Sequence, residues 1–421
     1  MIESGDIKIL IVNTFDIQGG AARASYRLHR ALLAQGEDSL MLVQRKSSDD
    51  YTVLIENNKL TKYFNKLRPI IDILPVRFYR NRKKSLFSPS WFGLSGVVEK
   101  INKINPDIVH LHWITGGMMK IEDVARINAP IVWSLHDNWA FTGGCHIMWE
   151  CERYKGTCGS CPMLGSDNEY DLSRRIYFHK KKNFSRKEDM TIVGLSRWIN
   201  NCSKNSSLLQ DKKHINLPNP IDTKVFKPFD KQKARELWSL PKDKKLVLLA
   251  VSSSTSDINK GFKQLTLALD DITDNDIELV VIGSSQPKNS QYFGFKTHYL
   301  GYLHDDVSLV TIYSAVDVMV VPSLQENLSN LIMENLACGT PVVGFNVGGN
   351  SDMIEHQVNG YLAKPFDASD LAFGIMWVLN SLRYEELCVN SREKVVREFD
   401  SVVVAERYMQ LYRSCIPDVS S

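Results

Sequence analysis

The stretch PSLQENLSNLIMENLACGTPVV (322–343) decides the fold of this chain, because it joins two segments that read as buried strands. VDVMVVP leads into it and PVVGF closes it, and both are apolar runs of strand length. Between them the pattern predicts a loop and then a helix, with Ser329 or Asn330 as the N-cap. A strand that leads through a loop into a helix is typical of a parallel α/β sheet. Free N–H groups at such a helix N-terminus favour an anion, so a phosphate fits there.

Two carboxylates flank this predicted phosphate site. Glu326 falls in the loop, and Glu334 follows it eight positions later in the helix. One carboxylate on each side of a phosphate can accept hydrogen bonds from hydroxyl groups, as an acidic residue does for the ribose in dinucleotide-binding sites. Two solvated surface side chains are the simpler interpretation of the pair taken by itself.

Length, charge and the N-terminal sequence limit the number of domains, the partners and the cellular compartment that we expect. The 421 residues, of which 43% are hydrophobic, predict two large domains with buried cores. A formal net charge of +3 and the lack of a nucleic-acid-binding motif argue against nucleic acid as a partner. The start MIESGDIKILIV lacks the pattern of a signal peptide, and no apolar run approaches the ~18 residues of a membrane span. We therefore expect a cytoplasmic protein, whose eight cysteines are thiols.

The pair Glu326 and Glu334, followed by ACGTPVV (337–343) and GGNSDMIEHQVNGYLAKPFD (348–367), resembles the donor site of the retaining, GT-B-fold glycosyltransferases of family 4. The resemblance implies transfer of a sugar, with retention, from a nucleotide-diphosphate donor to a hydroxyl of a glycan or lipid-linked oligosaccharide. No catalytic metal is expected, because such chemistry is mostly charge stabilisation of the leaving diphosphate. The alternatives are a nucleotide-sugar epimerase and a non-catalytic sugar-binding scaffold on the same fold.

The resemblance extends along the chain and implies an α/β fold of two doubly wound, Rossmann-like parallel-sheet domains that face each other across a cleft. Residues 1–216 are expected to form the N-terminal, acceptor-side domain, and residues 217–398 the nucleotide-sugar donor-binding domain. INLPNPIDTKVFKP (215–228), with its paired prolines, resembles the hinge between them. Residues 399–421 are expected to form a helix that crosses back to the first domain.

The resemblance also gives roles to single residues. Glu326 would contact the donor sugar and Glu334 would hold the ribose. Lys260, at a predicted junction of loop and helix, matches the family's phosphate-binding lysine, and its ammonium would neutralise the diphosphate. The usual partner arginine is absent, since serines occupy that region at 252–254. The further donor-binding candidates are Gly19, Gly20, Leu300, Gly301, Tyr302, Asn327, Leu328, Ser329 and Asn330.

Histidines lie at the ends of two predicted strands. PDIVHLHW (106–113) contains His110 and His112, and PIVWSLHD (130–137) contains His136. The carboxyl ends of parallel strands form the rim where ligands bind, although each histidine by itself is more often a structural residue. By resemblance His136 is the cleft histidine near the donor sugar, so we predict that it is catalytic. A neutral imidazole there can bind a sugar hydroxyl or help an acceptor proton move.

The segment CHIMWECERYKGTCGSC (145–161) predicts a structural zinc site. Its cysteines have the spacing C-x5-C-x6-C-x2-C, and four clustered thiols in a reducing compartment favour tetrahedral zinc. The alternatives are free thiols and an oxidation-dependent disulfide. In the zinc site, His146 is a substitute ligand for one of the cysteines. The pattern resembles a subset of family 4 enzymes that build bacterial surface polysaccharides of the colanic acid or capsule type. The candidate ligands are Cys145, Cys151, Cys158 and Cys161.

The segment 59–84 is basic and amphipathic. It contains nine lysines and arginines against one acid, Asp72, with large apolar side chains between them. Such a segment suits an anionic membrane surface, at about 1 kcal/mol per cation near that surface. A solvated face of a core helix is the other interpretation. We predict peripheral association with the inner face of the membrane, and we expect Pro69 and Pro75 to prevent one long helix.

Overall fold

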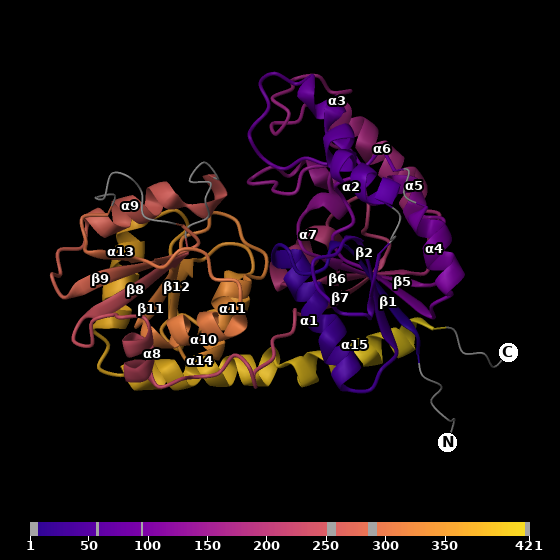
Figure 1. Cartoon of the computed structure of the whole chain (residues 1–421). Helices are drawn as coiled ribbons and strands as arrows, with labels where there is room; N and C mark the ends of the chain where they lie inside the picture. The colour runs from indigo at the N-terminus through magenta and orange to yellow at the C-terminus, as the bar shows by residue number, and fades with distance from the viewer. Residues whose placement is uncertain (1–6, 56–58, 94–95, 251–257, 285–292, 417–421) are drawn as a thin grey trace. The chain divides into compact units, whose positions relative to one another are not determined.

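The computed structural model describes residues 7–55, 59–93, 96–250, 258–284 and 293–416, without the side chains of residues 59–64. The chain folds into two compact units, of which the first contains residues 1–220 and 404–421 and the second contains residues 221–403. Each unit is built on one parallel sheet with helices on both faces (Figure 1). The predicted α/β class with two doubly wound sheets is therefore confirmed.

The first unit carries a seven-stranded sheet in the order β3-β2-β1-β4-β5-β6-β7, and every neighbouring pair is parallel. Strands β4, β5 and β6 are buried along their whole length, because helices cover both faces of a parallel sheet. The apolar runs KILIVN and DSLMLVQR form β1 and β2. The strands are β1 (Ile9–Phe15), β2 (Ser39–Arg45), β3 (Val53–Leu54), β4 (Ile108–Leu111), β5 (Ile131–Leu135), β6 (Met190–Gly194) and β7 (Lys213–Asn216).

Two helices of this unit begin at polar side-chain caps. Asp171 accepts hydrogen bonds from the N–H groups of Ser173 and Arg174, and Ser196 accepts one from Ile199. These bonds satisfy N–H groups that have no partner within the helix. The helices are α1 (Gly20–Ala34), α2 (Lys59–Asp72), α3 (Leu74–Arg77), α4 (Val97–Ile104), α5 (Ile121–Val124), α6 (Leu172–Phe184) and α7 (Arg197–Lys204).

One helix boundary differs from the prediction. Pro75 lies at the start of α3, after a break at Ile73, but Pro69 lies inside α2 and does not end it. A proline in a helix leaves the carbonyl four residues earlier without its usual N–H donor. Here that carbonyl belongs to Asn65, and the Arg45 guanidinium donates to it at 2.8 Å. This replacement donor explains why α2 continues through Pro69.

The second unit carries a six-stranded parallel sheet in the order β10-β9-β8-β11-β12-β13. Its strands are β8 (Lys245–Ala250), β9 (Ile277–Ile282), β10 (Thr297–Tyr299), β11 (Val318–Val321), β12 (Val342–Phe345) and β13 (Gly360–Ala363). Its helices are α8 (Lys231–Leu237), α9 (Phe262–Asp270), α10 (Asp306–Ala315), α11 (Asn330–Ala337), α12 (Asn350–Met353), α13 (Ala368–Leu379) and α14 (Tyr384–Glu398). Among the described residues of both units, no helix combines the length and apolar composition that crossing a bilayer requires.

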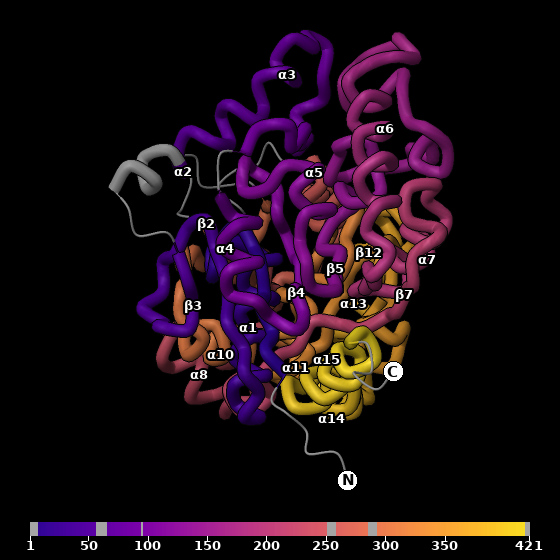
Figure 2. Tube along the Cα trace, turned by 90° about the vertical axis from the view of Figure 1, so that its right-hand side faces the viewer, coloured from indigo at the N-terminus to yellow at the C-terminus, as the bar shows by residue number. Residues whose placement is uncertain are grey.

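The C-terminal helix α15 (Ser401–Cys415) packs against the sheet of the first unit. The Tyr412 hydroxyl lies 2.7 Å from the His110 ring on β4, and the Tyr408 hydroxyl lies 3.2 Å from the Ser134 hydroxyl on β5. All four side chains are buried. Figures 1 and 2 both show this helix, in yellow, below the strands of the unit. The last helix of the chain therefore completes the core that the N-terminal residues begin.

Candidate functional site

The candidate site of the second unit lies at one edge of its sheet. All six strands are parallel, so their carboxyl ends meet at this edge, where ligands bind in open α/β sheets. Lys260 follows β8, Tyr302 follows β10, Glu326 follows β11 and Gly348 follows β12. The fold therefore brings motifs that are far apart in the sequence to one rim.

A residue that the sequence analysis missed holds the loop with Glu326 in place. The Asn259 side chain accepts a hydrogen bond from the Gln325 N–H and donates one to the Gln325 carbonyl, both at 2.9 Å. The Asn259 carbonyl also accepts a hydrogen bond from the Leu324 N–H at 2.8 Å. Asn259 thereby ties the segment with Lys260 to the loop with Glu326. Asn259 could have been identified from the sequence, because it directly precedes Lys260.

Two glycines let the loops of this rim touch. Gly261 has φ 65°, and a Cβ there would lie 1.8 Å from the carbonyl oxygen of Pro322. Gly348 has φ 54°, and a Cβ there would lie 1.8 Å from the carbonyl oxygen of Glu326. The Gly349 N–H donates to that same oxygen at 3.0 Å. Contacts from the loops after β8 and β12 therefore fix the backbone around Glu326.

Lys260 is exposed at the rim. It ends the short 3-10 turn Ile258–Lys260, directly before the glycine that begins α9. Its side chain can therefore reach a ligand, whereas the preceding Asn259 is buried. The serines at 252–254, where the resemblance leads us to expect a phosphate-binding arginine, lie outside the described residues.

The helix after the Glu326 loop begins where the sequence predicted. Ser329 is the N-cap of α11, with extended backbone, and Glu326 lies in the loop before it. The Ser329 side chain makes no capping hydrogen bond to the helix. A helix N-terminus of this kind favours an anion.

The second carboxylate of the motif has a different environment. Glu334 is fully buried on α11, and its Oε2 accepts a hydrogen bond from the Tyr313 hydroxyl of α10 at 2.8 Å. Glu326, by contrast, is only partly buried. A ribose can contact Glu334 only if the side chains that cover this carboxylate move. The sequence analysis missed Tyr313, which carries no motif of its own.

The predicted base-reading segment extends β10 by backbone hydrogen bonds. The Leu300 N–H donates to β9 at 2.9 Å, and the Gly283 N–H donates to the Gly301 carbonyl at 2.7 Å. Tyr302 lies just beyond and is 53% exposed, so it does not belong to the core. Its ring stacks on His304 with 6.3 Å between the centroids. An exposed aromatic ring at this rim can stack on a base.

A second rim lies on the first unit, at the carboxyl ends of β1, β4 and β5. Gly19, which has φ 96°, is the N-cap of α1, and Gly20 begins that helix. His112 follows β4 and His136 follows β5, and the His112 Nδ1 lies 2.8 Å from the His136 Nε2. The His112 Nε2 is buried and has no hydrogen-bond partner in the described part of the chain. The predicted catalytic His136 is therefore joined to a second histidine.

The histidines of this rim are neutral at pH 7. Burial lowers the pKa of His110 to about 3 and that of His136 to about 4, and it lowers the pKa of His112 well below the usual value. A neutral imidazole can donate one hydrogen bond and accept another. His110 uses both ring nitrogens, toward Tyr412 and Ser134, so its role is structural.

Asp137, which the sequence analysis also missed, organises the surroundings of His136. Its carboxylate accepts hydrogen bonds from the Trp113 indole at 2.8 Å and from the Trp139 N–H at 2.9 Å. It also lies 2.6 Å from the Nδ1 of His146, whose Nε2 lies 2.8 Å from the Ser88 hydroxyl. Both nitrogens of His146 are therefore used, and the expectation that it could replace a cysteine as a metal ligand is wrong.

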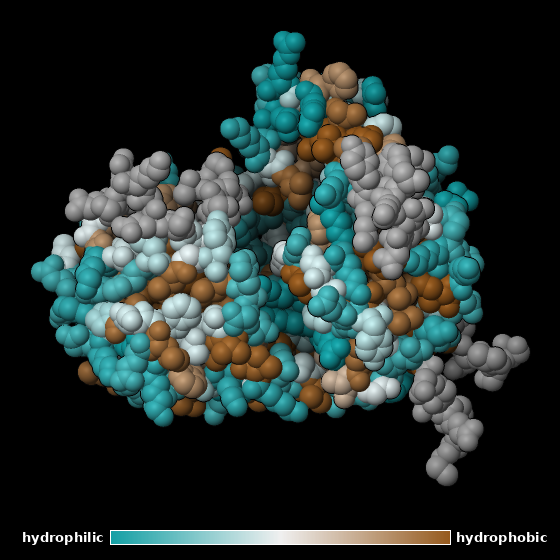
Figure 3. Space-filling model, viewed as in Figure 1, coloured by the Kyte–Doolittle hydropathy of each residue, from teal (hydrophilic) through white to brown (hydrophobic). Residues whose placement is uncertain are grey.

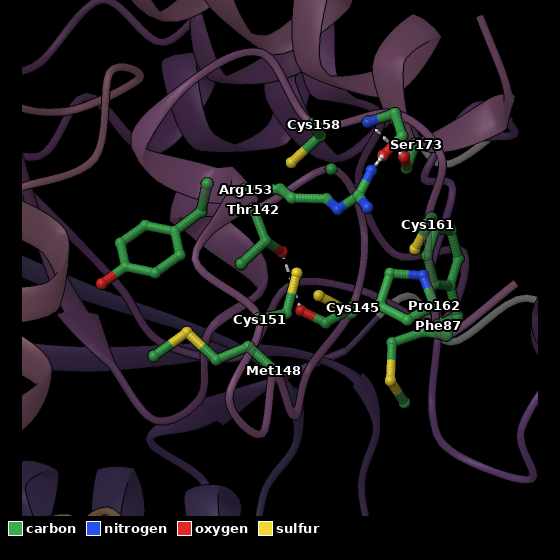
Figure 4. Close-up of a pocket in the computed structure, with 14 residues that line it drawn as sticks. Phe87, Thr142, Cys145, Met148, Cys151, Arg153, Cys158, Cys161, Pro162 and Ser173 are labelled. Carbon is green, nitrogen blue, oxygen red and sulfur yellow. Dashed lines mark hydrogen bonds between the residues drawn. The ribbon is translucent and has the colours of Figure 1, made fainter. Parts of the chain in front are cut away.

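The four predicted metal ligands line one pocket of the first unit (Figure 4). All four cysteines are free. Burial raises the pKa of Cys158 to about 12, and it also raises the pKa of Cys145 and of Cys161. In the described ranges, no three His, Cys, Asp or Glu side chains are gathered so that they could hold a metal ion. The zinc site therefore stays a prediction.

Two families of known domains match this chain. Residues 18–160 match the description Glycosyltransferase Family 4, and residues 245–381 match the description Glycosyl transferases group 1. The first match lies in the first unit and includes His136. The second lies in the second unit and includes Lys260 and Glu326.

Individual proteins are similar over shorter or longer parts of the chain. WcaC of Escherichia coli, named for colanic acid biosynthesis, is 23% identical over 83% of this chain and 85% of its own. A Campylobacter jejuni N-acetylgalactosaminyltransferase, named for a sugar-diphospho-undecaprenol acceptor, is 26% identical over 47% of this chain and 54% of its own. The solved structure of Anabaena HepE with UDP-glucose has a TM-score of 0.64, 16% identity and coverage of 97% and 100%. Such structural neighbours confirm the GT-B fold.

Proposed function

Because the chain belongs to the family 4 glycosyltransferases, we propose that it transfers a sugar from a nucleotide-diphosphate donor to a hydroxyl of a glycan or lipid-linked acceptor. The observation that carries this proposal is the rim of the second unit. There Lys260, the loop with Glu326 and the segment 300–302 meet at the carboxyl ends of parallel strands.

The donor has a suitable partner for each of its parts along this rim. The exposed ring of Tyr302 suits the base, and the exposed ammonium of Lys260 suits the diphosphate together with the first N–H groups of α11. Glu326 suits the hydroxyls of the sugar. The role of Glu334 toward the ribose requires the side chains that bury its carboxylate to move. Stabilisation of the leaving diphosphate then supplies most of the catalysis.

The acceptor is assigned to the first unit. His136 is neutral and held by His112, so it can bind a sugar hydroxyl or help the acceptor proton move. Retention at the transferred sugar and a role in bacterial surface polysaccharide synthesis complete the proposal. The similarity to WcaC supports that role, and the Campylobacter jejuni relative supports a lipid-linked acceptor.

The proposal includes peripheral binding to an anionic membrane, where a lipid-linked acceptor would be met. Leu74 and Phe78 are 41% and 85% exposed on and just after α3, and the cations Arg77 and Arg80 beside them are exposed as well. Hydrophobic side chains gather among hydrophilic ones around α3 (Figure 3). Shallow apolar insertion combined with basic groups is how amphipathic segments bind anionic lipid surfaces.

The test is turnover with defined donors. The purified chain is incubated separately with UDP-glucose, UDP-galactose, UDP-N-acetylglucosamine and GDP-mannose, with and without an undecaprenyl-diphosphate-linked sugar. We expect release of nucleoside diphosphate from one donor to depend on the acceptor, and labelled sugar to appear on the lipid. Conversion of a donor into its epimer without acceptor would show the first alternative. Donor binding that raises the melting temperature, with no turnover for any acceptor, would show the non-catalytic scaffold.

A further inference from the structure

We propose that the first unit holds one zinc ion through the thiolates of Cys145, Cys151, Cys158 and Cys161, and that the buried Lys180 is the counter-ion of this site. The zinc would tie the segment 145–161 to α6. This role is independent of the sugar-transfer chemistry.

The four thiols line one pocket of the first unit. Its remaining walls come mainly from apolar side chains such as Phe87, Met148 and Met163. Among the described residues that line it, none carries a carboxylate or an imidazole. Four thiols, with no carboxylate or imidazole among the described residues of the lining, are the donor set of structural zinc and do not suit magnesium or calcium.

Two of the ligands lie on a turn that the protein already holds in place. Cys158 and Gly159 have φ values of 55° and 99°, so the chain reverses between the cysteines of the CxxC sequence. The Cys161 N–H donates to Asp171, the N-cap of α6, at 2.7 Å. Arg174 of the same helix donates to the Cys158 carbonyl at 3.1 Å. The start of α6 therefore sets the spacing of this ligand pair.

The four thiols have to come closer together to share one zinc ion. The four thiols stand around the pocket and are not gathered at one point (Figure 4). Zinc–sulfur bonds are about 2.3 Å long, so binding must draw the four thiols closer together. Cys151 lies in irregular backbone outside the helices and strands, which can shift toward the turn at 158–161 more easily than a strand can.

The charge of Lys180 is the second observation that points to bound zinc. This side chain is fully buried on α6, and its ammonium donates to the carbonyls of Trp139 and Thr142 and lies 3.6 Å from the centre of the Trp139 ring. These partners are neutral, and a buried cation is unfavourable without a compensating negative charge. The nearby Asp137 carboxylate offsets part of this charge, and Cys145 and Cys158 lie close enough for their thiolates to offset more of it. Zinc bound by four thiolates carries a net negative charge, which supplies that compensation.

The first test is the metal content of the wild-type chain. The full chain is purified without chelator, and its zinc is measured by mass spectrometry and by X-ray absorption at the zinc edge. We expect about one zinc per chain with four sulfur neighbours at about 2.3 Å. The absence of zinc, a shell of nitrogen or oxygen atoms, or disulfides among the four cysteines in reduced preparations would overturn the proposal.

The second test uses variants with a matched control. Cys161→Ser is expected to lose the zinc, whereas Cys388→Ser, which changes a partly buried cysteine of the second unit, is expected to keep it. If Cys161→Ser does not fold, the absorption spectrum of the wild type still decides. Lys180→Met is expected to release zinc to a chelator several-fold faster than the wild type. An unchanged release rate would show that Lys180 is not the counter-ion.

Discussion

Glu326 and Glu334 are equivalent in the sequence pattern, but their environments differ in the folded chain. Glu326 stands partly exposed in a loop, whereas Glu334 is fully buried and bonded to Tyr313. The proposed division of labour gives the donor sugar to Glu326 and the ribose to Glu334. The exposed Lys260 adds the positive charge that a leaving diphosphate needs. Two predictions at the residue scale test the roles of Glu326 and Lys260.

Glu326→Gln is expected to lower kcat strongly while the affinity for nucleoside diphosphate stays nearly unchanged, because the proposed contact of Glu326 is with the sugar. Steady-state kinetics and calorimetric titration with nucleoside diphosphate measure the two effects separately. Glu385→Gln changes an exposed carboxylate on α14 and serves as the control. Equal losses of turnover and nucleotide affinity would contradict the assignment.

Lys260→Ala is expected to cost about 3 kcal/mol of transition-state stabilisation, a loss similar to that of one strong electrostatic contact to the reacting charge. The melting temperature should not change, because Lys260 is exposed. Lys263→Ala, which removes another exposed cation one turn further along α9, is the matched control. If kcat/KM of the Lys260 variant equals that of the wild type, another group neutralises the diphosphate.

At the scale of elements, close contact between loops decides the shape of the donor rim, and Gly348→Ala tests it. A Cβ at this position would lie 1.8 Å from the Glu326 carbonyl oxygen, so the loop must shift. We expect a clear loss of both melting temperature and kcat/KM. Gly294→Ala is the control, because Gly294 has a similar φ of 68° but no atom within 4 Å of the added Cβ. Its cost should be only the backbone strain, about 1 kcal/mol. Similar effects of the two substitutions would show that the contact with Glu326 is unimportant.

The region around α3 carries a prediction of its own. Binding to anionic vesicles should fall as salt rises, since charges are screened over about 8 Å at physiological ionic strength. Reversal of Arg77, Arg80, Lys83 and Lys84 to Glu should abolish sedimentation with these vesicles and leave nucleotide binding unchanged. The control reverses four other exposed cations of the first unit, Lys103, Lys182, Arg186 and Lys204. Equally strong binding to neutral vesicles, or none at low salt, would indicate an ordinary packing element.

At the scale of the whole molecule, the two units should respond differently to acid. Burial lowers the pKa values of five histidines of the first unit: His29, His110, His112, His136 and His214. A lowered pKa means that the fold favours the neutral imidazole. The stabilisation is therefore complete above the unfolded pKa of about 6.5 and is lost as the pH falls toward about 4. Burial raises the pKa of Asp72 to about 6 and also raises that of Asp123, and these two carboxyl groups act in the opposite direction against five histidines.

Hydrogen exchange measured by mass spectrometry at pH 7 and pH 5 reads the two units separately. After correction for the intrinsic exchange rate, protection of the first unit should fall at pH 5 more than that of the second. His29→Gln should reduce the fall, because it removes one buried imidazole that is bonded to Ser39 and Thr52. Greater loss of protection in the second unit would contradict the prediction.

Local features of the sequence determined much of this protein. The apolar runs could only be buried strands, and the stretch 322–343 was correctly divided into loop, N-cap and helix, because Ser329 and Glu326 act within a few residues of their own position. Parallel strands then implied that Lys260 and Glu326 lie at one edge of one sheet. These conclusions need only hydrophobic patterning and the hydrogen-bonding needs of a helix N-terminus.

Only the tertiary structure decided which side chains meet. It joined His112 to His136, bonded Glu334 to Tyr313 and let Arg45 replace the donor that Pro69 lacks. In each case the partners come from different elements, and their distance depends on how those elements pack. Periodicity and spacing describe one element at a time, whereas a hydrogen bond between elements requires a position within a few tenths of an ångström. That position is set by packing of the whole core, which no local pattern contains.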